Sequence, residues 1–453
     1  MCIRDSLTAD AFNPLAGENI AAQTALISYT AAVSALHGTL APKLRELEME
    51  ELYYNVELPL CRVLADMETA GFLVDRDALA DFGTALQKTT DRVEQAIYDA
   101  AGETFNINSP KQLGYILFEK LQLPHGKKTK TGWSTNADVL EKLRHAYPIV
   151  DDVLCFRQYT KLKSTYVDGL MKVIDMDGRI RTSFQMTVTA TGRLSSTEPN
   201  LQNIPVRTEL GREIRRAFVA SPGRVLVGAD YSQIELRLLA HMSGDTAMVE
   251  AFRTGADIHA ITAGEVFGVA PEAVTSQQRS AAKAVNFGIV YGISDFGLAR
   301  NIGVSRKEAG DYIQRYFQRY PGVKAFMDRC VQEGREKGYA TTLLGRRREL
   351  PELASSNFNT RSFGERVAMN MPIQGTAADI IKLAMVRVYQ ALEREGLQAK
   401  LVLQIHDELI LDTPMEEAER VKPLLKACME EAMLLSVPLI ADVREGHSWY
   451  DTK

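Results

Sequence analysis

The stretch RVLVGADYSQIELRLLAHMSG at 224–244 changes its hydrophobic pattern part-way along. Up to Asp230 it is a short apolar run rich in valine and leucine, which predicts a buried β-strand. After Asp230 the pattern predicts an α-helix. A carboxylate at the end of such a strand is poorly placed for packing, so Asp230 is a candidate functional residue. The alternative is that Asp230 is an ordinary N-cap of the following helix.

The stretch AKLVLQIHDELILDTP at 399–414 predicts two strands that meet near His406 and Asp407. Glu408 follows directly, and the three residues could simply be the polar tip of a hairpin. If this strand pair joins the strand that ends at Asp230, two carboxylates lie at adjacent strand ends. Hard cations such as Mg²⁺ prefer oxygen ligands, and two ions roughly 3.5–4 Å apart can serve a phosphoryl displacement. Together the two stretches predict a two-metal site.

The stretch RSAAKAVNFGIVYG at 279–292 places two cations and two aromatic residues at intervals of four. These residues are Arg279, Lys283, Phe287 and Tyr291, and in a helix they project along one face. Cations followed by aromatic rings match a nucleotide that runs from its phosphates to its base, with Lys283 near the phosphates. The alternative is an aromatic core stripe over which long cationic side chains lie.

The remaining sequence predicts an α+β protein in which sheet segments alternate with long helical runs. A helix is predicted over 16–49, and TAGFLVDRDAL at 69–79 predicts a short strand followed by an Asp-capped helix. Ser109 is predicted to cap a further helix. Alternation in GRIRTSFQMTVTATG at 178–192 predicts strands, and VPLIADVREG at 437–446 predicts another.

The composition is that of an ordinary globular protein, with 45% hydrophobic and 25% charged residues and a net charge of −5. No run approaches the roughly 18 consecutive apolar residues of a membrane helix, and the first residues contain no signal-peptide core. The scattered cysteines form no CxxC pair, which argues against a zinc site or disulfide framework and favours a reducing cytoplasm. Two basic segments, 125–132 and 300–348, favour a partner with a phosphate backbone.

Three of these stretches resemble, in order and near-complete wording, the polymerase motifs of family A DNA polymerases. They are DYSQIELRLLAH at 230–241, RSAAKAVNFGIVYG at 279–292 and QIHDELI at 404–410. TATGRLSSTEPNLQNIP at 189–205 and ERVAMNMPIQGTAADIIK at 365–382 are similar to two further blocks of the bacterial DNA polymerase I group. The similarity runs from about residue 50 to the end of the chain. Several long motifs in the right order make the resemblance highly specific.

The resemblance implies an α+β fold shaped like a right hand, with an antiparallel-sheet palm and mainly helical thumb and fingers. The expected division is a remnant of the end of a 3′–5′ exonuclease-like domain at 1–49, mainly thumb with the first palm elements at 50–190, palm at 191–240, fingers at 241–364 and palm again at 365–453. The opening MCIRDS joins this plan abruptly, so we expect a truncated or artefactual start.

The resemblance also implies roles for individual residues. Asp230, Asp407 and the backbone carbonyl of Tyr231 would hold two Mg²⁺ ions, for which Mn²⁺ can substitute. Glu408 would support this catalytic group, and Lys283 would donate a proton to pyrophosphate. The residues expected to bind the incoming deoxynucleoside triphosphate (dNTP) are Arg279, Lys283, Phe287, Tyr291, Gln233, Glu235 and His259. The residues expected to bind DNA are Arg193, Asn200, Gln202, Arg366, Asn370, Gln374, His406, Lys127, Lys128 and Lys130.

Two further details follow from this comparison of motifs. Glu235 lies five residues after Asp230, where its bulk would collide with a ribose 2′-OH and so select deoxynucleotides. Ser280 departs from the family pattern, which commonly has a second arginine there, but Arg279 keeps its spacing to Lys283. The expected DNA-binding residues are suited to binding DNA without sequence preference, because A·T and T·A pairs present the same hydrogen-bond acceptors in the minor groove.

The resulting expectation is a monomeric, cytoplasmic DNA-templated DNA polymerase with primer-template DNA and dNTPs as partners and no membrane. It would extend a primer 3′ end and release pyrophosphate, in DNA replication and repair. Neither proofreading nor 5′-nuclease activity is expected, because no acidic nuclease motif precedes residue 50. One alternative is a ribonucleotide polymerase or reverse transcriptase on a related palm, against which Glu235 argues. The other is a DNA-binding fragment without activity.

Overall fold

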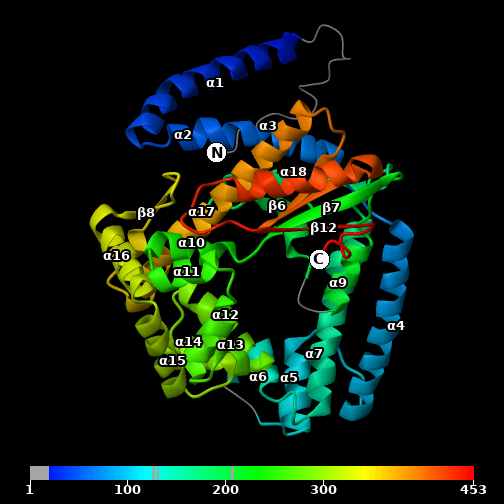
Figure 1. The fold of residues 1–453 in the computed structure, drawn as a ribbon. Helices are drawn as coiled ribbons and strands as arrows, with labels where there is room; N and C mark the ends of the chain where they lie inside the picture. The colour runs from blue at the N-terminus through cyan, green and yellow to red at the C-terminus, as the bar shows by residue number, and fades with distance from the viewer. Residues whose placement is uncertain (1–19, 125–127, 130–131, 206–208) are drawn as a thin grey trace.

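The computed structural model describes residues 20–124, 128–129, 132–205 and 209–453. Its largest described sheet has four antiparallel strands in the order β10–β11–β7–β12 (Figure 1). The strands are β7 (Arg224–Tyr231), β10 (Lys400–Ile405), β11 (Glu408–Pro414) and β12 (Ala441–Gly446). The predicted meeting of the two sheet segments is confirmed, because β7 pairs with β11 on one side and with β12 on the other.

The switch from strand to helix follows the predicted pattern. β7 ends at Tyr231, and α10 (Ile234–Ser243) begins shortly after it. Gln233, with a φ of 55° in the left-handed region, occupies the N-cap position and makes no side-chain capping bond. Asp230 is therefore not the N-cap of this helix, and the interpretation of Asp230 as a capping residue is wrong.

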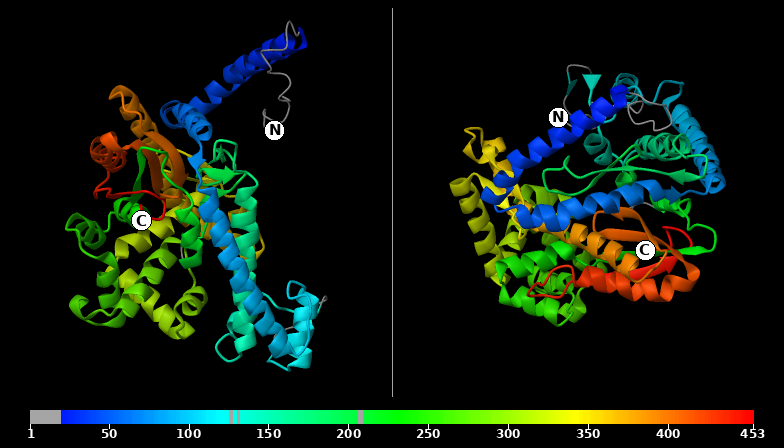
Figure 2. Two further views of the ribbon diagram at one scale, coloured as in Figure 1. Left: turned by 90° about the vertical axis from the view of Figure 1, so that its right-hand side faces the viewer. Right: turned by 90° about the horizontal axis from the view of Figure 1, so that it is seen from above.

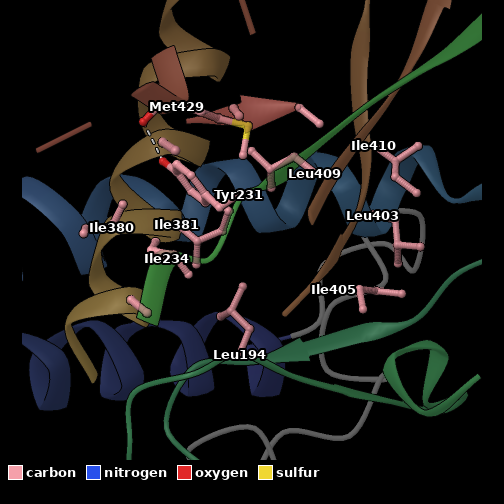
Figure 3. Packing of buried hydrophobic residues seen from close by; sticks show 14 of the residues in the cluster. Leu194, Tyr231, Ile234, Ile380, Ile381, Leu403, Ile405, Leu409, Ile410 and Met429 are labelled. Carbon is pink, nitrogen blue, oxygen red and sulfur yellow. Dashed lines mark hydrogen bonds between the residues drawn. The ribbon is translucent and has the colours of Figure 1, made fainter. Parts of the chain in front are cut away.

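The sheet is packed against helices from the last third of the chain. They include α17 (Phe358–Arg394) and α18 (Ala418–Glu430), which lie beside it in Figure 1. Figure 3 shows Tyr231 of β7 among buried aliphatic side chains, with its hydroxyl donating to the Met429 carbonyl at 2.6 Å. Burial of each aliphatic side chain contributes about 1.5–3 kcal/mol, so the strand end that carries Asp230 rests on a tightly packed core.

Two helical groups extend from the sheet on opposite sides (Figure 1). The first is built on α4 (Arg76–Ala101) and α7 (Pro148–Lys161), and it has its own core, which includes Leu113 and Phe156. The predicted caps are present, since Asp75 caps α4 and Ser109 caps α5 (Pro110–Gly114). The second group consists of α11 (Thr246–Arg253), α12 (Ile258–Phe267), α13 (Ser276–Val290), α14 (Asp295–Ile302), α15 (Arg306–Arg319) and α16 (Pro321–Lys337).

Helix α1 (Ile20–Glu46) extends away from the rest of the chain (Figure 2). The side chains of residues 26–40 are all exposed, including Ile27 at 70%. The predicted helix over 16–49 is confirmed from residue 20 onward, and residues 16–19 lie outside the described part. None of the described helices combines the length and apolar character needed to cross a membrane.

The strands predicted over 178–192 are shorter than expected. Only β4 (Arg179–Ile180) and β5 (Ser183–Gln185) form, and β5 pairs with β6 (Ser195–Thr197). Beyond β5 the threonine-rich segment turns instead, because the Thr189 hydroxyl donates to the carbonyl of Arg193 at 2.6 Å. The strand predicted over 437–446 is likewise confined to Ala441–Gly446, the part that pairs with β7.

The remaining elements are short connectors and hairpins around these groups. They are α2 (Glu50–Leu52), η3 (Tyr53–Glu57), α3 (Leu58–Ala70), β1 (Phe72–Leu73), α5 (Pro110–Gly114), η4 (Tyr115–Lys120), β2 (Lys128–Thr129), β3 (Gly132–Trp133), α6 (Ala137–Glu141), η5 (Leu162–Val167), α8 (Asp168–Met171), η6 (Leu201–Asn203), α9 (Glu209–Arg216), η7 (Pro271–Ala273), β8 (Tyr339–Thr341), β9 (Arg347–Glu349), η8 (Pro351–Ala354) and η9 (Met415–Glu417).

Candidate active site

The ends of β7 and β11 bring the two predicted aspartates together. Glu408, the first residue of β11, lies opposite Asp230 in the sheet register. The backbone N–H of Tyr231 donates to the carbonyl of Asp407 at 3.1 Å. His406 has a φ of 52°, in the left-handed region, so the chain reverses between β10 and β11 and leaves Asp407 at the bend. The predicted pairing of two carboxylates at adjacent strand ends is present.

Burial and nearby negative charge perturb the carboxyl groups of Asp407 and Glu408. Burial, followed by the negative charge of Asp230, raises the pKa of Asp407 to about 7. Burial also raises the pKa of Glu408, which is only 2% exposed. Glu408 accepts a hydrogen bond from Trp449 Nε1 at 3.2 Å and pairs with Lys453 Nζ at 3.1 Å. A cation bound between the aspartates would relieve their repulsion.

The donor set fits hard divalent cations. Asp230 Oδ1 is buried and has no hydrogen-bond partner among the described residues, which leaves a ligand oxygen to be satisfied. Within the described ranges, no three His, Cys, Asp or Glu side chains gather closely enough to enclose an ion. Mg²⁺ usually keeps several waters and is bound through one or two carboxylates plus substrate phosphates. Two aspartates therefore suit Mg²⁺ better than a structural zinc ion, which takes four protein ligands.

Helix α13 presents its cations and aromatic residues to one cavity. Thr275 and Gln278 form a capping box that fixes the start of the helix. The helix ends at Val290, so Tyr291 is its C-cap residue. The cavity has a volume of about 540 Å³, within the range of roughly 300–1,000 Å³ typical of small-ligand sites. The site residues predicted from the sequence that line this cavity are Arg193, Gln233, Glu235, His259, Arg279, Lys283, Phe287, Tyr291, His406 and Asp407.

The two aromatic residues of this face border the cavity and are not sealed in the core. Tyr291 is 39% exposed, and Phe287 is half-buried with its ring centroid 6.0 Å from that of His259. Arg279 and Lys283 are exposed. Because both rings border the cavity, this face is not a fully buried aromatic stripe, although Phe287 also packs against the main core.

Two of the predicted phosphate-binding residues already have partners within the chain. Arg279 Nε donates to Asp257 Oδ2 at 2.6 Å. His259 is 3% exposed, and its Nδ1 lies 2.9 Å from the amide nitrogen Nδ2 of Asn286. The amide oxygen Oδ1 of Asn286 accepts a hydrogen bond from the Thr262 hydroxyl. Burial lowers the pKa of His259 to about 4, so the ring is neutral at neutral pH. Because Nδ1 accepts from the amide, the proton lies on Nε2, which can donate to an oxygen ligand.

Glu235 is held by partners from two different parts of the fold. Arg193 Nη2 donates to its Oε1 at 2.7 Å, and the Tyr291 hydroxyl donates to its Oε2 at 2.8 Å. Burial, with Glu235 adding to it, raises the pKa of Tyr291, which keeps the phenol protonated as a donor. The Glu235 side chain is 9% exposed but still borders the cavity. Its carboxylate therefore has a fixed position beside α13.

A second cavity shares the edge of the sheet at which Asp230 and Asp407 meet. His406 and Asp407 line it together with Gln202, Arg215 and Lys453, among others, and its volume is also about 540 Å³. The bend between β10 and β11 therefore faces two spaces. One of them is bordered by the cations of α13, and the other by residues that precede and follow β7 in the chain.

Comparison with known proteins identifies the family that has this geometry. Residues 76–451 match DNA polymerase family A. The chain belongs to this family. It is 55% identical over 430 residues to DNA polymerase I of Geobacillus stearothermophilus, covering 94% of this chain and 49% of that relative. Against DNA polymerase I of Lactococcus lactis subsp. lactis (strain IL1403) it is 54% identical over 412 residues, covering 91% and 47%. The chain thus spans about half the length of the curated relatives it matches.

A solved structure of the family has the same fold. The POL domain of Pol1 from M. smegmatis, in complex with DNA primer-template and dNTP, is 44% identical to this chain with a TM-score of 0.89. The match covers 93% of this chain and 75% of that one. The predicted α+β right-hand polymerase fold, with an antiparallel-sheet palm and mainly helical thumb and fingers, is confirmed. The predicted resemblance to bacterial family A polymerases is confirmed as well.

The residues predicted to bind DNA are spread more widely than the nucleotide-binding ones. Arg366, Asn370 and Gln374 follow one another at four-residue intervals on α17 and so share a face. Arg366 borders a further cavity, which Lys283, Phe287 and Tyr291 also line. Asn370 Oδ1 is buried without a partner among the described residues. Gln202 Nε2 donates to the carbonyl of Gln404 at 3.3 Å.

Asn200 and Lys128, also predicted to bind DNA, do not line these cavities. Asn200 is exposed just before η6. Lys128 pairs with Glu119 at 3.7 Å, and its ammonium lies 4.9 Å from the ring centroid of Trp133. Lys127 and Lys130, predicted with it, lie outside the described residues.

The structure also adds residues that the motifs did not indicate. Lys453 reaches Asp230 and Glu408, with its Nζ 3.8 Å from Asp230 Oδ2. Trp449 is fully buried beneath the same carboxylates, where its indole N–H reaches Glu408. Asp257 could have been suspected from its place just before His259, but nothing in the local sequence around Lys453 indicates a role at the site.

Proposed function

We propose that the chain is a DNA-templated DNA polymerase that adds deoxynucleotides to a primer 3′ end and releases pyrophosphate, in DNA replication and repair. The observation that carries this proposal is that Lys283, Phe287 and Asp407 line the same cavity. A cation, an aromatic ring and a metal-binding carboxylate facing one space match the triphosphate, the sugar and the reacting phosphorus of a nucleotide. Membership of family A supports the same activity.

The side chains of α13 would bind the incoming nucleotide. Arg279 and Lys283 would make charge-assisted hydrogen bonds to the triphosphate, with Arg279 exchanging Asp257 for phosphate oxygens. His259 would donate from Nε2 to a further phosphate oxygen. Phe287 would pack on the deoxyribose. Lys283 would also protonate the pyrophosphate as negative charge develops on the leaving group.

Two Mg²⁺ ions, or Mn²⁺ in their place, are the proposed cofactors, held by Asp230, Asp407 and the backbone carbonyl of Tyr231. When bound, such ions stabilise the attacking and leaving oxygens of an in-line phosphoryl displacement. The contribution of the chain is to hold these ligand oxygens at one edge of a packed sheet. Glu408 supports this edge through its hydrogen bond from the buried Trp449.

We assign the primer-template to the second cavity and to a partly exposed face of α17. Arg193, Gln202 and His406 would contact the duplex next to the reacting end, with Arg366, Asn370 and Gln374 along α17. Side-chain donors there would meet the minor-groove acceptors that A·T and T·A pairs share, so no sequence would be preferred. Lys128 and its basic neighbours would hold duplex phosphates, which position DNA without reading it.

The domain plan that accompanies this proposal has the palm at 191–240 and 365–453, between mainly thumb at 50–190 and fingers at 241–364. The four-stranded sheet and the two helical groups support these limits. The enzyme would act as a monomer, because one copy of the chain supplies every proposed catalytic residue. It would work in the cytoplasm, which the scattered cysteines without a CxxC pair favour.

Primer extension tests the proposed function directly. With a DNA primer-template, dNTPs and Mg²⁺, the purified chain should extend the primer to the end of the template. Ribonucleotides in place of dNTPs, or an RNA template in place of DNA, should support much less synthesis. Equal extension with ribonucleotides would favour a ribonucleotide polymerase. A cooperatively folded protein that binds primer-template DNA without extending it would identify the inactive binding fragment.

Replacing Glu235 by alanine should relax sugar selection. The carboxylate is fixed by Arg193 and Tyr291, so its bulk cannot move aside for a ribose 2′-OH. We expect the ratio of kcat/KM for a dNTP to that for the matching ribonucleotide to fall by about tenfold to a hundredfold. Competitive incorporation on one primer measures the ratio. The Glu265→Ala change, at an exposed position of α12, is the matched control, and an unchanged ratio in Glu235→Ala would remove the residue from this role.

The chain should not proofread. The acidic residues before position 20, Asp5, Asp10 and Glu18, do not form a predicted nuclease constellation, and they lie outside the described residues. A primer with a mismatched 3′ end, incubated with the protein and Mg²⁺ but without nucleotides, should therefore stay at full length. Shortening that disappears in the Asp407→Ala protein would contradict this expectation, because a contaminating nuclease would be unaffected by the substitution.

A further inference from the structure

A buried cluster of four charges joins η3, the turn between β8 and β9, and α17. Arg346, between β8 and β9, donates from Nε to Asp379 Oδ1 at 2.7 Å and pairs through Nη2 with Glu57 of η3. Lys382 Nζ donates to Glu57 Oε1 at 2.7 Å. Asp379 and Lys382 of α17 are completely buried, and the Arg346 side chain is only 13% exposed. Two positive and two negative charges balance, so none of the four is left uncompensated.

Additional hydrogen bonds fix the orientation of Arg346. The Thr342 hydroxyl donates to Asp379 Oδ2 at 2.7 Å and accepts from the backbone N–H of Arg346 at 3.1 Å. With carboxylates on two sides, the planar guanidinium has one available orientation. The mechanism of nucleotide addition uses none of these residues. Three separate segments of the chain, η3, the turn between β8 and β9, and α17, nevertheless contribute to holding this single side chain.

The held guanidinium lies directly against Gly192. A Cβ built on Gly192 would lie 2.6 Å from Arg346 Cδ and 2.7 Å from Cζ, which is closer than real Cβ contacts. Gly192 has a φ of 80°, in the left-handed region that favours glycine. It belongs to the turn at 189–193, which is closed by the bond from the Thr189 hydroxyl to the Arg193 carbonyl. The Arg346 side chain therefore packs against this turn at Gly192.

The turn carries the residue that holds Glu235. Arg193, next to Gly192, donates to Glu235 Oε1 at 2.7 Å, and Tyr291 holds the other oxygen. A continuous series of contacts thus runs from the buried charges to the cavity wall. A shift of the turn by an ångström would break the bond from Arg193, because hydrogen bonds weaken beyond about 3.2 Å.

We propose that Arg346 is a positioning residue for sugar selection: by supporting the turn at 189–193 it holds Arg193 against Glu235. This inference rests on the proposed function and deepens it. Arg346→Lys keeps the charge but loses the planar fork that spans Asp379 and Glu57 and fills the space beside Gly192. The ratio of kcat/KM for a dNTP to that for its ribonucleotide should then fall by about tenfold, with a larger change in KM than in kcat.

A double-mutant cycle separates positioning from general destabilisation. The ratio of kcat/KM for a dNTP to that for its ribonucleotide is measured for the parent, Arg346→Lys, Arg193→Ala and the double variant. If Arg346 acts through Arg193, the double variant should match Arg193→Ala alone. Additive effects, or an unchanged ratio in Arg346→Lys, would overturn the proposal. The matched control is Arg181→Lys, because Arg181 also spans two carboxylates, those of Asp175 and Asp177, and should leave the ratio unchanged.

A second variant approaches the same contact from the other side. Gly192→Ala leaves all four buried charges in place but inserts a methyl group where Arg346 packs. It should lower the ratio as Arg346→Lys does, and a normal ratio would overturn the proposal even if Arg346→Lys does not fold. A parent protein that extends no primer would refute the proposed function. A parent that extends primers, with an effect of Arg193→Ala but none of Arg346→Lys or Gly192→Ala, would refute this inference alone.

Discussion

Replacing Asp407 by asparagine should lower kcat for nucleotide addition by more than about a hundredfold and leave primer-template affinity nearly unchanged. Loss of a group that merely orients a metal ligand costs about 10- to 100-fold, so loss of a ligand itself should cost more. Asp230→Asn should have the same effect, because the two carboxylates meet at paired strand ends. Single-turnover extension measures the rate, and fluorescence anisotropy of labelled primer-template measures the affinity.

The effect of Asp407→Asn on the melting temperature should show whether the loss of activity comes from the missing carboxylate or from misfolding. The pKa of Asp407 is raised to about 7 in the folded chain by burial and by Asp230. When the pKa of a carboxyl group is higher in the folded than in the unfolded protein, the folded protein loses stability as the pH rises. The loss extends from the unfolded pKa, near 4, through the folded pKa, about 7. At pH 8 without metal, Asp407→Asn should therefore melt no lower than the parent.

Activity within tenfold of the parent in either aspartate variant would refute the metal assignment. A fall in melting temperature accompanied by loss of DNA binding would mean that the substitution acts through the fold. The control is Asp328→Asn on α16, an exposed carboxylate that pairs with Lys324 and should change neither the rate nor the affinity.

Replacing Phe287 by tyrosine should increase the acceptance of dideoxynucleotides. Phe287 borders the cavity between Lys283 and Tyr291 but has no hydroxyl, so in the parent a bound nucleotide's own 3′-OH would supply the polar contact to its phosphates. A dideoxynucleotide lacks that contact and should be disfavoured. A phenolic O–H can replace it. A hydrogen bond to a charged group contributes about 1.5–3 kcal/mol, which corresponds to roughly 10- to 100-fold in relative incorporation.

The measurement is the ratio of kcat/KM for a dNTP to that for its dideoxy analogue, in parent and variant. Phe296→Tyr on α14 makes the same chemical change at a residue that is 65% exposed, and it should leave the ratio as it is. Equal use of both nucleotides by the parent, or an unaltered ratio in Phe287→Tyr, would mean that this ring does not lie over the sugar.

Much of the local structure could be predicted because it depends on neighbours in the sequence. The apolar run before Asp230 became β7, and the helical spacing after it became α10. Four-residue intervals correctly placed Arg279 and Phe287 on one face of α13. Side-chain caps such as Ser109 were visible for the same reason, since a cap acts within one turn of the helix.

The strands at 178–192 show where local pattern was insufficient. β-Branched residues favour a strand only where a partner strand is available. Beyond Gln185 the chain instead closes a turn through Thr189 and Arg193. That turn is the one that supports Glu235, so the departure from the predicted pattern occurs beside the proposed sugar-binding part of the site.

The sequence by itself determined the candidate residues and the helices and strands that carry them, because these depend on periodicity and on contacts within a turn. Only the tertiary structure decided which of them meet. The register of β7 with β11 sets Glu408 opposite Asp230, and Lys382 bonds Glu57 across 325 positions of sequence. Such contacts depend on how whole elements pack, and packing is set by the summed burial of many side chains rather than by any short pattern.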